Sequence, residues 1–219
     1  MEFVNKNGDL EMFQNYRRLR YIKRCNNYPT IISTDVAQHS YFTTMIAMIL
    51  TDEYNTWVEE HNSEYHPSDM ENYHVLLNGE AVLRKALLHD IEESFTSDIP
   101  YNVKHLNTRI NNVLTTDLRD YVDSQYVETV TTSMYNQMNK SCKLGLAGQV
   151  VAVSDMIELA WYCCDEMALG NFHLKEILTR CKEFLDEFEF SKTLRVASEF
   201  YKSVEDMIKG TLEGNNEKQ

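Results

Sequence analysis

The residues best suited to chemistry are two histidines and two aspartates that recur on stretches with helical spacing. His39 lies in AQHSYF, His89 and Asp90 are adjacent in LLHDIEESFTSDIP, and Asp155 interrupts the apolar stretch VVAVSDMIELAW. Burying a carboxylate or an imidazole costs several kcal/mol unless the group is paired or bound to a metal. Two imidazoles and two carboxylates suit a divalent transition metal, and they leave coordination positions for water and a phosphate oxygen.

The second of these stretches places polar groups on the same helical face as apolar ones. Val82, Ala86, the pair His89 and Asp90, and Glu93 fall on one stripe of a helix expected over about 79–94. This pattern predicts that the polar groups face inward. A His-Asp dipeptide by itself is equally consistent with an ordinary pair at a wet helix edge, so the dipeptide alone leaves both interpretations open.

Three further histidines, His61, His66 and His74, lie in a polar segment expected to form a loop or a short helical excursion over 54–73 and beyond. They could indicate a second metal site. Their spacing in a polar segment favours solvated side chains instead.

The elements that must position these residues are helices. Only three prolines and seven glycines interrupt the chain, and apolar residues recur mostly at intervals of three or four. We expect an all-α protein with one domain over 1–210 and a flexible tail over 211–219. The expected helices cover about 10–25, a stretch from a cap at 33–35 to 53, then 79–94, 102–122, 125–139, 143–168, 173–188 and 191–209.

Composition excludes several functional classes. The net charge of −13 should repel nucleic acid and anionic membranes. No apolar run approaches the ~20 residues of a membrane span, and the polar residues 1–9 do not resemble a signal peptide. Five cysteines without a C-x-x-C pair suggest free thiols in a reducing compartment. We therefore expect a cytoplasmic protein.

The series H…HD…D on successive helices resembles the HD-domain metal-dependent phosphohydrolases. It is most similar to the bacterial HD-domain 5'-deoxynucleotidases, which have bacteriophage relatives that act on deoxynucleoside triphosphates such as dATP. The most specific element is H-D-x-x-E followed by T-x-D-[IL]-P-x-x-V-K, and the resemblance spans roughly 13–172. The matching stretches are RLRYIKR (18–24), HS (39–40), HDIEESFTSDIPYNVK (89–104), SD (154–155) and EMALGN (166–171).

This resemblance implies an HD-domain helical bundle that hydrolyses deoxynucleoside monophosphates and associates as a homodimer or higher homo-oligomer. It also implies one divalent metal ion (Mn, Co, Zn or Mg) bound by the four residues named first. Glu93 and Asp98 are the implied catalytic residues. Glu93 would activate water or support the ligands, and Asp98 would orient water or transfer a proton. Asp98 is also consistent with an ordinary turn aspartate before Ile99 and Pro100.

The resemblance also implies the substrate contacts. Arg24 matches a family arginine, and a guanidinium fork suits phosphate oxygens. Cys25, Thr96, Arg18 and Lys104 are further candidates for the nucleotide site. Arg18 could instead be structural, Thr96 a helix-end hydroxyl and Lys104 a surface lysine.

Three positions depart from the family pattern. Cys25 stands where tryptophan is usual, Gln38 where glutamate is frequent, and Ile32 where an arginine is usual. The residues that recognise the substrate are therefore altered, which leaves open the preference for deoxyribose and the choice between monophosphates and triphosphates. A non-catalytic nucleotide-binding signalling module is a further alternative, but such a module would be expected to lack metal ligands or Glu93 and Asp98.

Overall fold

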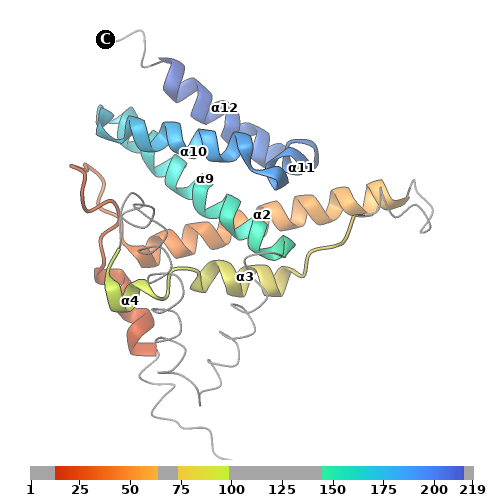
Figure 1. Cartoon of the computed structure of the whole chain (residues 1–219), viewed down its shortest axis with the longest axis horizontal. Coiled ribbons are helices and arrows are strands. Elements are labelled where there is room, and N and C mark those ends of the chain that lie inside the picture. Colours follow the sequence, from red (N-terminus) through yellow and green to blue (C-terminus); the bar gives the residue numbers. More distant parts are fainter. Residues whose placement is uncertain (1–12, 64–73, 99–144, 215–219) are drawn as a thin grey trace, which may run out of the picture. The chain divides into compact units, whose positions relative to one another are not determined.

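The computed structural model describes residues 13–63, 74–98 and 145–214 (Figure 1). Over these ranges the regular structure is helical, apart from one isolated antiparallel bridge between Lys23 and Asp35. The all-α prediction is therefore confirmed. The helices predicted over 102–122 and 125–139 lie outside the described residues. The described residues form two compact units: 13–40 with 88–98, and 41–63 with 74–87 and 145–214.

The first unit has a small apolar core. Residues 13–18 are helical and continue into the 3-10 helix η1 (Leu19–Tyr21). The chain then becomes extended at Ile22, so the helix predicted over 10–25 ends early. The core residues are Leu19, Val36 and Ile91, with Tyr16, Ile22, Ala37 and Phe95 packed against them.

Helix α2 (Val36–Ser63) is longer than predicted. Asp35 caps its first turn, because its Oδ1 accepts a hydrogen bond from the amide of Gln38 at 2.9 Å. Of the two alternatives for 54–73, a loop or a short helical excursion, residues 54–63 are helical, and they extend α2 instead of forming a separate helix. The reason is that Tyr54 and Val58 are buried at helical spacing, so this polar segment still has one apolar face.

Helix α3 (Gly79–Leu88) ends before the HD motif, so the helix predicted over 79–94 is interrupted. Residues 89–92 form a turn that leads into the short helix α4 (Glu93–Thr96). Backbone bonds here join residues three apart, such as Ile91 N–H to the Leu88 carbonyl at 3.1 Å. This tighter winding changes the direction of each side chain and brings Ile91 into the core of the first unit.

The C-terminal part of the second unit begins with α9 (Leu146–Ala168), close to the predicted 143–168. Gly170 has φ of 91°, and the Asn171 amide donates to the Glu166 carbonyl at 2.9 Å. These features form a C-cap at Gly170 and Asn171, just after the helix end predicted at 168. Helix α9 packs against α10 (Lys175–Glu187) and α12 (Glu199–Gly214), as Figure 1 shows.

The last two predicted helices divide into shorter pieces. The 3-10 helix η3 (Phe172–Leu174) precedes α10, and the helix predicted over 191–209 is broken between α11 (Glu189–Ala197) and α12. At the break, Ser198 Oγ accepts a hydrogen bond from the Tyr201 amide at 2.9 Å. Helix α12 continues to Gly214, so the segment predicted as a flexible tail begins inside a helix.

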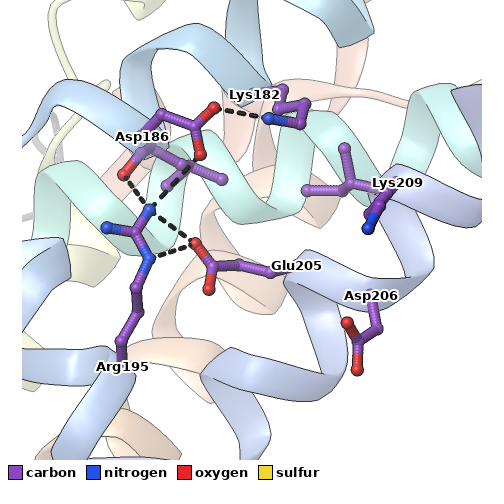
Figure 2. Close-up of a pocket in the computed structure, with 8 residues that line it drawn as sticks. Lys182, Asp186, Arg195, Glu205, Asp206 and Lys209 are labelled. Carbon is purple, nitrogen blue, oxygen red and sulfur yellow. Dashed lines mark hydrogen bonds and ion pairs between the residues drawn. The ribbon is translucent and has the colours of Figure 1, made fainter.

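Hydrogen bonds and ion pairs of charged side chains link α10, α11 and α12 around a cavity of about 350 Å³ (Figure 2). Arg195 Nε donates to Glu205 at 2.7 Å, and its Nη2 donates to the Leu185 carbonyl at 3.1 Å and to Asp186 at 3.3 Å. The hydrogen bond to Glu205 raises the pKa of the guanidinium. The Arg195 guanidinium at this cavity is thus bonded to acceptors of the protein itself.

Two further observations on the described residues concern membrane-spanning helices and cysteines. None of their helices has the length and apolar character that crossing a membrane requires. The cysteines among them are not joined by disulfide bonds; they are Cys25, Cys163, Cys164 and Cys181.

Candidate functional site

Two imidazoles meet in the first unit. His39 lies in the first turn of α2 and is fully buried, while His89 lies in the turn after α3. Their Nε2 atoms are 3.1 Å apart and their ring centroids 5.1 Å apart. A neutral imidazole carries one N–H and one lone pair, so two facing Nε2 atoms share at most one proton while both rings are neutral. The arrangement directs imidazole nitrogens from two distant segments to one point.

Asp90 adds a carboxylate to this pair. Its Oδ2 lies 3.3 Å from His89 Nε2 and 3.5 Å from His39 Nε2. The same oxygen accepts a hydrogen bond from Arg24 Nη1 at 2.9 Å. Burial by itself would raise the pKa of Asp90, but His89, Arg24 and His39 outweigh it and hold the pKa well below its usual range. The carboxylate is therefore ionised and available as a ligand.

This donor set fits a divalent cation. Imidazole nitrogen and carboxylate oxygen are the ligands that zinc, manganese and cobalt commonly take in proteins. A cation would also satisfy both imidazole lone pairs at once. The fourth predicted ligand, Asp155, is half-buried on α9 in the second unit.

The two glutamates of the motif differ in burial. Glu93 is the first residue of α4 and only 4% exposed, whereas Glu92 is half-buried. A carboxylate that is kept from solvent beside a cluster of ionisable groups is a typical general acid or base. The burial of Glu93 agrees with the inward-facing position that the helical pattern predicts, while its role stays a prediction.

Asp98 is tied to the segment that carries Arg24. Its Oδ2 accepts a hydrogen bond from the backbone amide of Cys25 at 3.1 Å. Cys25, which donates this bond, has a φ of 53°, and Ser97, which precedes Asp98, has a φ of 63°, so both segments contain a residue with positive φ. The contact joins the turn after η1 to the loop after α4.

The remaining predicted substrate contacts are Arg18, Thr96 and Lys104. Arg18 is exposed at the start of η1. The Thr96 hydroxyl donates to the Ser97 carbonyl at 3.0 Å, in keeping with its interpretation as a helix-end hydroxyl. Lys104 lies outside the described residues.

The possible second histidine site has another explanation. His61 stacks on Trp57 with ring centroids 4.8 Å apart, and His74 packs against the same indole at 4.7 Å. Asn62 fixes the backbone of His74 by accepting from its amide at 3.1 Å and donating to its carbonyl at 2.7 Å. The two rings therefore form an aromatic cluster at the end of α2 rather than a solvated loop, and His66 is outside the described residues.

Sequence reasoning missed two contacts of this site. It proposed Arg24 as a substrate contact but did not pair it with Asp90, and it did not foresee the bond between the Cys25 amide and Asp98. The left-handed conformation of Cys25 carries no sequence signal, because glycine or asparagine is the residue usually found there. The stretch RLRYIKR (18–24), which matches the family and contains Arg24, was the indication that this segment belongs to the site.

The chain is similar to known proteins over most of its length. A family model described as 5'-deoxynucleotidase YfbR-like matches residues 11–204. The crystal structure of an HD-domain phosphohydrolase from Listeria innocua superposes with a TM-score of 0.69 at 24% identity, covering 94% of this chain and 92% of that chain. Comparison with curated proteins found no match.

Two archaeal structures show the same fold. A Pyrococcus horikoshii protein superposes with a TM-score of 0.61 at 17% identity, covering 90% of this chain and 99% of that chain. A conserved hypothetical protein from Pyrococcus furiosus gives a TM-score of 0.58 at 20% identity, covering 89% and 98%. At such identities these structures establish the common helical fold.

Proposed function

Because this chain belongs to the YfbR-like 5'-deoxynucleotidase family and is a metal-dependent phosphohydrolase, we propose that it hydrolyses deoxynucleoside 5'-monophosphates. The reaction consumes one water and yields a deoxynucleoside and orthophosphate. The observation that carries the proposal is the meeting of His39 Nε2, His89 Nε2 and Asp90 Oδ2 within 3.5 Å of one another.

The proposed metal ligands are His39, His89, Asp90 and Asp155. His39, His89 and Asp90 of the first unit offer two imidazoles and a carboxylate, and Asp155 is included because it matches the family pattern. A divalent cation held there would polarise a phosphate oxygen and favour ionisation of a nearby water. Which of Mn, Co, Zn or Mg is the resident ion is left to measurement.

The proposed proton transfers belong to two carboxylates. Glu93, buried at the start of α4, accepts the proton of the attacking water or supports the ligands. Asp98 orients the water or passes a proton to the leaving oxygen. The amide of Cys25 holds one oxygen of Asp98, which keeps its carboxylate from rotating freely.

A local cation must attract the substrate, because the whole chain carries a net charge of −13. Arg24 is the proposed phosphate contact. Its Nη1 is bonded to Asp90, and a guanidinium has further N–H donors that can reach a phosphate oxygen. Arg18 and Lys104 would add positive charge at longer range, and Thr96 a hydroxyl.

One observation favours a second candidate, hydrolysis of deoxynucleoside triphosphates. Cys25 replaces the family's usual tryptophan beside Arg24 and is half-buried. A smaller side chain there leaves more room next to the phosphate contact. This candidate would release tripolyphosphate, or pyrophosphate, in place of orthophosphate.

A product assay separates the candidates. Purified protein is incubated with added Mn²⁺ or Co²⁺ and a panel of dNMPs, NMPs and dNTPs, and the phosphate products are resolved by chromatography. Orthophosphate from dNMPs alone supports the first proposal, and tripolyphosphate or pyrophosphate from dNTPs supports the second. Metal uptake and nucleotide binding without turnover would instead support a signalling module.

Homodimerisation and a cytoplasmic location are part of the same proposal. Light scattering coupled to size-exclusion chromatography measures the mass of the particle against the 25.7 kDa of one chain. A mass of one chain at micromolar concentration would contradict the dimer.

A further inference from the structure

Arg24 makes an unusually direct contact with the motif. Its Nη1 lies 2.9 Å from Asp90 Oδ2, and the two side chains are only 12% and 15% exposed. A charge-assisted hydrogen bond at this distance and burial is stronger than a surface ion pair, because little solvent screens it. The bonded oxygen, Oδ2, is also the one that faces both imidazoles.

The backbone around Arg24 is fixed on both sides. The Arg24 amide donates to the Thr34 carbonyl at 3.2 Å, and the preceding Lys23 forms the isolated bridge with Asp35. The following residue, Cys25, donates its amide to Asp98. The Arg24 side chain therefore extends from a backbone segment that is held by hydrogen bonds on both sides.

The lone pairs of Asp90 Oδ2 allow it to bind Arg24 and a cation at the same time. A carboxylate oxygen has two lone pairs. Arg24 occupies one direction at Oδ2, and the other remains for a cation between the imidazoles. Ligating carboxylates are commonly held in this way by a second hydrogen bond, which fixes their orientation.

We propose that Arg24 is a positioning residue for Asp90, in addition to its proposed contact with phosphate. It holds the carboxylate so that Oδ2 faces His39 and His89, and it thereby strengthens binding of the divalent cation. The role assumes the metal of the proposed function. The two roles use different donors of one guanidinium.

The test measures metal affinity without substrate. Metal-free wild type, Arg24→Gln, Arg24→Lys and Arg20→Gln are titrated with Mn²⁺ and with Co²⁺ by calorimetry, after thermal unfolding has shown that each is folded. Arg20 is the matched control, because it is an exposed arginine of η1 bonded to Tyr21. Arg24→Gln should weaken binding by about 10–100-fold. Arg24→Lys should recover part of the loss, since an ammonium can donate one bond to Oδ2.

Three results would overturn the inference. Unchanged affinity in folded Arg24→Gln would limit Arg24 to the substrate, and tighter binding would make it a competitor of the cation. An equal loss in Arg20→Gln would reduce the effect to general surface charge. If Arg24→Gln does not fold, Arg24→Met takes its place, because it keeps an unbranched side chain but has no N–H donor for Asp90 Oδ2. Wild-type metal affinity in folded Arg24→Met would contradict the positioning role in the same way.

The outcome is separable from that of the proposed function. Wild type that binds metal but hydrolyses no nucleotide would refute the function while the affinity comparison still stands. Wild type that hydrolyses dNMPs, with no effect of Arg24→Gln on metal affinity, would refute only the positioning role.

Discussion

His39 and His89 are fifty residues apart in the chain, and their Nε2 atoms are 3.1 Å apart in the structure. The first residue belongs to the start of a long helix and the second to a turn that follows another helix. Two imidazole nitrogens at this distance can share one proton or bind one common cation.

Replacement of His89 by glutamine should release the cation. Removing a direct ligand should weaken metal binding and slow phosphate release by at least about 100-fold, since loss of a merely supporting contact already costs up to that much. Metal analysis after dialysis and turnover at fixed Mn²⁺ measure both effects. His173→Gln, at an exposed histidine of η3, is the control and should match wild type. Retained metal with full turnover in His89→Gln would remove His89 from the ligand set.

Glu93→Gln should separate chemistry from metal binding. The amide has nearly the shape of the buried carboxylate but cannot accept a proton, so kcat should fall by about 10²–10⁴-fold while the bound metal remains. Steady-state kinetics and metal analysis of the same preparation test this. Glu92→Gln is the matched control on the adjacent residue and should keep wild-type kcat. Full turnover in Glu93→Gln would make the catalytic assignment wrong.

Substitutions at Cys25 should reveal its left-handed backbone. At a φ of 53°, a β-branched residue is strained, so Cys25→Val should lower the free energy of unfolding by about 1–2 kcal/mol relative to Cys25→Ala. Cys25→Gly should be at least as stable as Cys25→Ala, because glycine adopts this conformation without steric strain. Urea denaturation of the three variants provides the ranking. Valine as stable as alanine would show that the turn has another conformation in solution.

Stability should fall at alkaline pH because of Tyr201. Burial raises the pKa of Tyr201 to about 12, from 10.0 for an ordinary tyrosine. Below pH 10 the phenol is neutral in both folded and unfolded chains; between pH 10 and 12 only the unfolded chain loses the proton, which favours unfolding by up to about 1.4 kcal/mol per pH unit.

Denaturation of wild type and Tyr201→Phe at pH 9, 10 and 11 isolates this effect, because other titrating groups are common to both proteins. The phenylalanine variant should lose less stability over this range. Tyr41→Phe, at an exposed tyrosine, is the control. Equal pH slopes for wild type and Tyr201→Phe would contradict the prediction.

Much of the fold was predictable where the signal is local. The cap at Asp35, the helix over 146–168 and its end at Gly170 follow from side chains that act within a few residues of themselves. The extension of α2 beyond residue 53 was missed because its polar side chains obscured the buried pair Tyr54 and Val58. The end of α3 at Leu88 was missed because a three-residue winding has nearly the same sequence pattern as a helix.

The sequence by itself determined the helical class, the donor types of the site and the likeness to a phosphohydrolase family, since periodicity and motif spacing are properties of neighbouring residues. Only the tertiary structure decided that Arg24 bonds Asp90, 66 positions away, and that the Cys25 amide bonds Asp98, 73 positions away. Those contacts exist because Leu19, Val36 and Ile91 share one core and bring their three segments together. The packing of that core, rather than any local preference, sets which donor meets which carboxylate.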